Sequence, residues 1–146
     1  MSQASSNLRV FVDANVLLDV VLHRTRYIKD SLLLLQLGFQ DRVTLVTTAS
    51  TFHAVRYVAF KSRGRGAMEV LEALLRQFAF IPETVDSVRA GLSYKDPEDA
   101  ALAFACIEAG VNLVATRDVA GFAPFQERGL RPMLPAVLAA RIVNAS

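Results

Sequence analysis

Two aspartates stand where apolar runs of the sequence end, a place where α/β proteins often bind ligands. Asp13 directly follows the run Val10 to Val12, and Asp118 lies just beyond the stretch Val111 to Ala115, which is apolar except for Asn112. Short apolar runs of this kind are typical of buried strands. Because the carboxyl ends of parallel strands share one edge of a sheet, Asp13 and Asp118 are expected to converge there.

A second pair of acids stands at a predicted helix start. Asp96 precedes Pro97, and Asp99 follows three residues after Asp96. In a purely structural interpretation, Asp96 is the N-cap, Pro97 takes the first helical position and Asp99 favours the helix dipole. Asp118 has a similar alternative, in which it bonds its own turn. In the functional interpretation, the helix start lies beside the sheet edge and brings Asp99 to Asp13.

Converging carboxylates repel one another, and a divalent cation among them removes that cost. Oxygen ligands of this kind suit Mg²⁺ or Mn²⁺. Such a metal activates water and stabilises the transition state of phosphoryl transfer. The pattern therefore predicts a catalytic and metal-binding site of Asp13, Asp99 and Asp118, with Asp96 as a further metal ligand. Asn15 either bonds its local turn or orients Asp13.

The elements that must position these acids alternate between strand and helix patterns. This alternation predicts a mostly parallel sheet covered by helices on both faces, a three-layer α/β/α fold. A basic connection is expected at 62–66 and a loop at 121–124. Strands are predicted at 10–12, 43–47, 78–81, 111–115 and 130–134, and helices at 16–22, 27–37, 50–61, 67–77, 84–92, 96–109 and 135–143.

Length and composition limit the class of protein. The chain has 146 residues, of which 53% are hydrophobic and 21% charged, so one globular domain over 1–146 is expected, with a flexible N-terminus at 1–7. No apolar run reaches the roughly 18 residues that cross a bilayer. The single cysteine, Cys106, excludes an internal disulfide and predicts a core position. A cytoplasmic protein is expected.

Basic residues form two clusters in a chain with a formal net charge of +2. Arg24 and Arg26 form the first cluster, and Lys61, Arg63 and Arg65 form the second. Such clusters can hold phosphates of a nucleic acid. The alternative is that both belong to ordinary solvated loops.

Three segments together resemble the PIN domain, a metal-dependent ribonuclease fold that serves as the toxin in many bacterial toxin–antitoxin pairs. The first is Val-Phe-Val-Asp-Ala-Asn-Val-Leu-Leu-Asp at 10–19. The second is Asp-Pro-Glu-Asp-Ala-Ala-Leu-Ala-Phe-Ala at 96–105, and the third is Asn-Leu-Val-Ala-Thr-Arg-Asp at 112–118. Their order and spacing span nearly the whole chain.

The resemblance implies a parallel sheet of about five strands with an acidic pocket at its carboxyl edge. It also implies cleavage of RNA phosphodiesters with Mg²⁺ or Mn²⁺. Asp13, Asp99 and Asp118 match the acidic motif of the family, and Thr116 matches its small hydroxyl residue. As partners it suggests RNA, a small antitoxin protein that covers the site and a possible homodimer. Arg24, Arg26, Arg63, Arg65 and Arg117 are candidates to hold the RNA backbone.

The chain departs from the family pattern at two acidic positions. The glutamate usual on the helix after the second strand is replaced by Ala54, and an aspartate common before a phenylalanine is replaced by Gly121. Fewer acids imply weaker metal binding or loss of a second metal, with Asp96 or Glu98 as partial substitutes.

Two other functions compete with a ribonuclease. The missing acids fit a catalytically degenerate PIN-like module that binds RNA or protein. A phosphotransfer enzyme of the haloacid dehalogenase type also places an aspartate after its first strand, but it needs a second aspartate two residues later. That residue is Asn15 here, which cannot act as the general acid.

Overall fold

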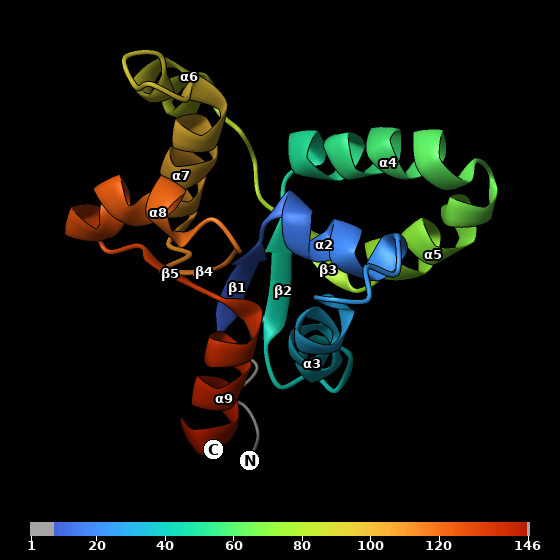
Figure 1. The fold of residues 1–146 in the computed structure, drawn as a ribbon. Coiled ribbons are helices and arrows are strands. Elements are labelled where there is room, and N and C mark those ends of the chain that lie inside the picture. The colour runs from blue at the N-terminus through green and yellow to red at the C-terminus, as the bar shows by residue number, and fades with distance from the viewer. Residues whose placement is uncertain (1–7, 146) are drawn as a thin grey trace.

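The computed structural model describes residues 8–145, so the flexible N-terminus predicted for 1–7 lies outside the described residues. A parallel sheet with the strand order β3-β2-β1-β4-β5 forms its centre (Figure 1). The strands are β1 (Arg9–Val12), β2 (Thr44–Thr47), β3 (Phe78–Phe80), β4 (Leu113–Ala115) and β5 (Arg131–Met133).

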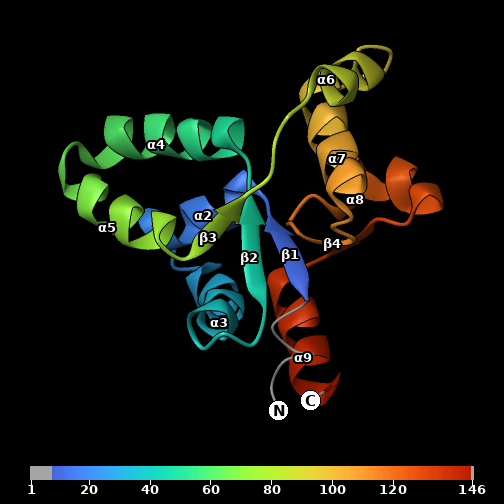
Figure 2. The ribbon, with the colours of Figure 1, turned by 180° about the vertical axis from the view of Figure 1, so that it is seen from behind.

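Helices connect successive strands and cover both faces of the sheet, which confirms the predicted three-layer α/β/α class (Figures 1 and 2). The helices are α2 (Ala14–Val21), α3 (Ile28–Phe39), α4 (Ala49–Arg63), α5 (Gly66–Leu75), α6 (Val85–Gly91), α7 (Pro97–Ala109), α8 (Val119–Phe122), the 3₁₀ helix η1 (Ala123–Arg128) and α9 (Pro135–Ala145).

The central strand β1 shows how the layers divide the core, because its side chains alternate between the two faces. Val10 and Val12 pack into one buried cluster with residues of α2, α3, α4, α5 and α9. Phe11 packs into the opposite cluster with residues of α7 and η1. A fully apolar strand with both faces covered is what a parallel sheet requires.

The carboxyl ends of β1 and β4 lie side by side. Val12 is paired with Ala115, and the Asp13 amide donates a hydrogen bond of 3.0 Å to the Ala115 carbonyl. Residues that follow these two strands are therefore held within hydrogen-bonding reach of each other. This register is what brings the segment after Val12 to the segment after Ala115.

The predicted loop at 121–124 is wrong, because helical turns occupy this region as α8 and η1. Asp118 caps α8, since its Oδ1 accepts a hydrogen bond of 3.1 Å from the Gly121 amide. Pro124 lies in the first turn of η1, where a missing amide hydrogen costs nothing. A strong cap thus starts helical turns in a stretch whose glycine and proline suggested a loop.

Two predicted helix boundaries also differ. The helix predicted at 27–37 continues as α3 through Gly38 to Phe39. A Cβ atom on Gly38 would lie 2.4 Å from Leu45 of β2, so the glycine serves close packing of the helix on the sheet. The basic connection expected at 62–66 is shorter, because α4 extends to Arg63 and α5 starts at Gly66.

Within residues 8–145, no helix is long and apolar enough to cross a membrane.

Candidate functional site

Asp13 is held in place by the start of α2 and by the segment after β4. Its Oδ1 accepts a hydrogen bond of 2.9 Å from the Ala14 amide. Its Oδ2 accepts one of 2.8 Å from the Thr116 hydroxyl and a longer one of 3.4 Å from Asn15 Nδ2. These three donors fix the orientation of the carboxylate at the sheet edge.

Thr116 and Asn15 also tie Asp13 to the loop that carries Asp118. The Thr116 hydroxyl accepts a hydrogen bond of 2.9 Å from the Asp118 amide while it donates to Asp13. Asn15 Oδ1 accepts one of 3.2 Å from the Arg117 amide. The two supporting residues named from the sequence therefore contact the acids and their backbone directly.

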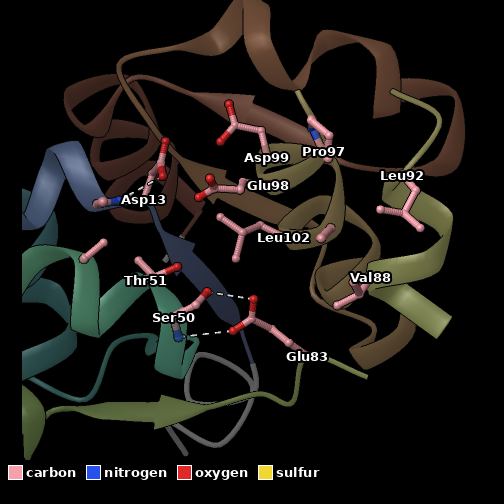
Figure 3. A pocket seen from close by; sticks show the side chains of 13 residues that line it. Asp13, Ser50, Thr51, Glu83, Val88, Leu92, Pro97, Glu98, Asp99 and Leu102 are labelled. Atoms are coloured by element: carbon pink, nitrogen blue, oxygen red, sulfur yellow. Dashed lines mark hydrogen bonds between the residues drawn. The ribbon is translucent and has the colours of Figure 1, made fainter. Parts of the chain in front are cut away.

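A cleft of about 380 Å³ opens beside Asp13, and Glu98 and Asp99 line it from α7 (Figure 3). In Figure 3 both α7 acids point toward the side on which Asp13 lies. Asp96 does not line the cleft; its Oδ1 caps α7 by accepting a hydrogen bond of 3.1 Å from the Asp99 amide. The structure thus gives Asp96 the capping role and brings Asp99 to Asp13.

Asp118 lies at the edge of this arrangement and not among the residues that line the cleft. Its carboxylate turns back over α8, where a Cβ atom on Gly121 would lie 2.4 Å from Asp118 Oδ2. Glycine at 121 therefore leaves the space that this conformation of Asp118 needs. An acid at position 121 would have to displace the Asp118 carboxylate.

The remaining walls of the cleft are partly apolar and partly polar (Figure 3). Ala54, at the position where the family resemblance expects a glutamate, lines the cleft with a methyl group. Val88 of α6, Leu92 directly after α6 and Leu102 of α7 form an apolar wall. The cleft thus combines an acidic side with an apolar side.

Glu83 is a further acid in the cleft that the sequence analysis did not single out. Its carboxylate accepts hydrogen bonds from Ser50 at the start of α4, 2.7 Å from the hydroxyl and 3.1 Å from the amide (Figure 3). Glu83 follows β3 at the carboxyl edge of the sheet. The strand-end rule that identified Asp13 and Asp118 could have identified it too.

A buried ion-pair cluster lies behind the site. Asp19 of α2 has no solvent exposure and binds Arg117 through two hydrogen bonds of 3.0 Å. It also accepts a hydrogen bond of 3.0 Å from Ser31 and pairs with Arg24 at 3.5 Å. The Arg117 guanidinium stacks 4.0 Å above the ring of Tyr27. This cluster anchors the residue between Thr116 and Asp118 to α2 and α3.

The arginines proposed from sequence to hold RNA occupy different settings. Arg24 and Arg117 are engaged by Asp19, and Arg63 donates a hydrogen bond of 2.7 Å to the Val21 carbonyl. Arg26 and Arg65 are exposed. An RNA contact by any of the five stays a prediction.

Burial and mutual repulsion act on the acids of the site. Burial, opposed by the hydrogen bonds from Thr116 and Ala14 and assisted by the charge of Asp118, raises the pKa of Asp13. Burial and the charges of Asp96, Asp13 and Asp118 raise the pKa of Asp99 to about 6. The ionised acids therefore destabilise one another in the folded chain.

The donor chemistry fits a divalent cation. Carboxylate oxygens are the ligands that Mg²⁺ and Mn²⁺ prefer, and a cation would relieve the repulsion that raises the pKa of Asp99. In the part of the chain that the structure describes, however, no three His, Cys, Asp or Glu side chains are grouped closely enough to hold a metal ion as they stand. The acids fit the metal by type and charge, in an open arrangement.

The raised pKa of Asp99 predicts how stability changes with pH in the metal-free protein. The ordinary aspartate pKa is 3.8 and the folded value is about 6, so the folded chain binds the proton more tightly than the unfolded chain. The free energy of unfolding should therefore fall as pH rises through this range. Asp99→Asn should remove this contribution. The melting temperature of the variant minus that of wild type should therefore increase as pH rises from about 4 to about 7 in EDTA. A difference that stays constant with pH would contradict the assignment.

Comparison with known proteins adds a family match. A sequence model described as the PIN domain matches residues 9–120, which include Asp13, Asp96, Asp99 and Asp118. The matched segment covers the strands from β1 to β4 and the start of α8. No curated protein matches the chain.

Proposed function

The chain belongs to the PIN domain family, a nuclease-type fold, and on that premise we propose that it is a metal-dependent endoribonuclease. The observation that carries the proposal is the cleft that Asp13 and Asp99 share at the carboxyl edge of the sheet. Acids gathered where their charges raise a pKa are typical of active sites.

The residues divide into distinct roles in this proposal. Asp13, Asp99 and Asp118 would hold Mg²⁺ or Mn²⁺, with Asp96 as an outer acid. When bound, the cation supplies a nucleophilic water at neutral pH and neutralises charge on the phosphoryl group. Thr116 and Asn15 keep Asp13 oriented through the hydrogen bonds described above. Loss of a residue that hydrogen-bonds to a metal ligand typically reduces metal affinity or activity by about 10- to 100-fold.

The alanine at position 54 gives a gain-of-function prediction. Ala54 lines the same cleft as the α7 acids, so Ala54→Glu would add a carboxylate to the wall. More ligand charge strengthens the binding of a hard cation, and we expect the Mn²⁺ dissociation constant to fall about tenfold. Ala54→Gln, which has the same shape without the charge, should bind as wild type does. Equal affinities for all three proteins would contradict this role for the position.

RNA cleavage tests the proposed function directly. Purified full-length protein is incubated with a structured RNA in Mn²⁺, in Mg²⁺ or in EDTA, beside Asp30→Asn, which changes an exposed acid of α3. The proposal expects cleavage with either metal by both proteins and none in EDTA. An absence of cleavage in every condition would overturn it.

The competing function is a degenerate PIN-like module that binds RNA or protein without cleaving it. The observation that favours it is the open arrangement of acids, with Ala54 in the cleft wall. This module would show no thermal shift on addition of Mn²⁺. The nuclease proposal expects a shift to higher melting temperature, because a ligand that binds only the folded state stabilises it.

The most specific part of the proposal is that the chain acts as a toxin and is inhibited by a small antitoxin protein. This part rests on the family alone. It expects that expression of the chain in a bacterial host arrests growth, whereas Asp13→Asn does not. Growth arrest by both proteins, or by neither at equal expression, would contradict it.

A further inference from the structure

Helix α4 begins at the acidic cleft, which Ser50, Thr51 and Ala54 line. Figure 1 shows that the helix leads away from the sheet. The sequence of α4, Ala49–Arg63, carries basic residues and no acid. Its aromatic residues are interleaved with the basic ones: Phe52, His53, Arg56, Tyr57, Phe60, Lys61 and Arg63. Basic and aromatic side chains in alternation are typical of surfaces that bind single-stranded nucleic acid.

One side of α4 connects the cleft with this surface. Ser50, Ala54, Tyr57 and Lys61 follow one another at spacings of four, three and four residues, which places them on one side of the helix. Ser50 and Ala54 line the cleft. Tyr57 and Lys61 therefore continue the same side beyond it, and Lys61 lies about 16 Å from Ser50 along the helix axis.

Tyr57 and Lys61 form an exposed pair at the outer end of this stripe. The Tyr57 residue is 61% exposed, which is high for an aromatic residue on a packed helix. Lys61 Nζ donates a hydrogen bond of 3.3 Å to Tyr57 Oη and lies 5.2 Å from the centroid of its ring. An aromatic ring with an ammonium group at its side offers a stacking surface and a phosphate partner together.

We propose that the stripe Ser50–Ala54–Tyr57–Lys61 binds a single-stranded segment of the RNA substrate and leads it into the acidic cleft. One unpaired base stacks on Tyr57, and the phosphate beside it pairs with Lys61. The charge of α4 favours a polyanion as its occupant over a protein, because the helix carries no acid to pair with basic side chains of a partner. The inference rests on the proposed function, since it names the form of RNA that the same site takes.

Binding in EDTA tests the stripe without cleavage. The anisotropy of a short fluorescent single-stranded RNA is measured with the full-length chain and compared with an RNA duplex of the same length. Tyr57→Ala should raise the dissociation constant for the single strand about tenfold, because stacking on the ring is lost. Tyr57→Phe keeps the ring and should stay within about twofold of wild type. Duplex binding should be insensitive to Tyr57, since paired bases are not available for stacking.

Salt dependence separates the phosphate contact from the stacking contact. Lys61→Ala should reduce the slope of log affinity against log salt by about 0.7, the value for one contact to a single strand. Matched controls are Phe39→Ala, an exposed aromatic at the end of α3, and Arg141→Ala, an exposed base of α9. Both controls should bind RNA as wild type does.

Two results would overturn the inference. The first is Tyr57→Ala binding single-stranded RNA as tightly as Phe39→Ala does. The second is a change in molar mass by light scattering in Tyr57→Ala at unchanged RNA affinity, which would assign this face to a second copy of the chain. If the wild type cleaves RNA with metal but Tyr57→Ala binds RNA as wild type does, the role of the stripe is overturned and the nuclease proposal stands. If Tyr57→Ala weakens RNA binding but the wild type cleaves no RNA, the stripe stands as an RNA-binding surface and the nuclease proposal is overturned.

Discussion

Asp13→Asn is expected to reduce metal-dependent RNA cleavage by about 10³-fold, more than the 10- to 100-fold typical of losing an outer hydrogen-bond partner. The amide keeps the shape of the side chain but removes the charge at the centre of the proposed site. Initial cleavage rates on one RNA substrate measure the effect. Thr116→Val, which removes only the hydroxyl that donates to Asp13 Oδ2, should give the smaller loss.

The same substitution should not destabilise the metal-free chain. Burial raises the pKa of Asp13, so the ionised carboxylate is less favourable in the folded state than in water. Removing the charge removes that cost, whereas the amide nitrogen that replaces one oxygen cannot accept the hydrogen bond made there. The two effects oppose each other, and Asp13→Asn in EDTA should melt close to wild type. Folded Asp13→Asn protein that cleaves within about threefold of wild type would contradict the catalytic assignment.

Asp19→Ala is expected to have the largest effect on stability, a loss of about 3–5 kcal/mol in the free energy of unfolding. Asp19 is fully buried, and its removal leaves the two guanidinium nitrogens of Arg117 and the Ser31 hydroxyl without their acceptor. Urea unfolding monitored by circular dichroism measures the loss, provided that the transition is two-state.

An exposed ion pair provides the matched control for Asp19. Asp86 of α6 pairs with Arg89 at 3.4 Å, and both side chains are largely exposed. Asp86→Ala should cost less than about 1 kcal/mol, because a solvated pair contributes little. A loss below about 1 kcal/mol for Asp19→Ala as well would show that the buried cluster does not hold the fold together. The cluster also anchors the loop of Asp118, so cleavage should fall in the variant that remains folded.

Local patterns predicted the sheet and the place of Asp13 at its edge. Val10 to Val12 is apolar throughout because both faces of β1 are covered, and the polar residue after it marks the strand end. Asp96 and Asp99 predicted a helix start because the N-cap and the first turn of a helix depend on residues that are adjacent in the sequence. The parallel sheet then brings Asp13 and Asp99 to one cleft.

Features that depend on distant parts of the chain escaped prediction. Asp19 and Arg117 are 98 residues apart in the sequence, and no short-range pattern shows that their side chains form a buried ion pair. Glu83 reaches Ser50 across 33 residues and enters the cleft from the segment that follows β3, and no local pattern links the two residues. Asp118 was placed at the correct edge, but its turn back over Gly121 depends on side-chain packing.

Direct titration of Mn²⁺ tests the central claim, that the acids at the sheet edge form a site for a divalent cation. Free Mn²⁺ is followed by electron paramagnetic resonance at neutral pH in wild type, Asp13→Asn and the exposed control Asp30→Asn. The account predicts saturable binding to wild type and to Asp30→Asn, weaker by about tenfold or more in Asp13→Asn. Equal binding by all three proteins, or no saturable binding by wild type, would contradict it.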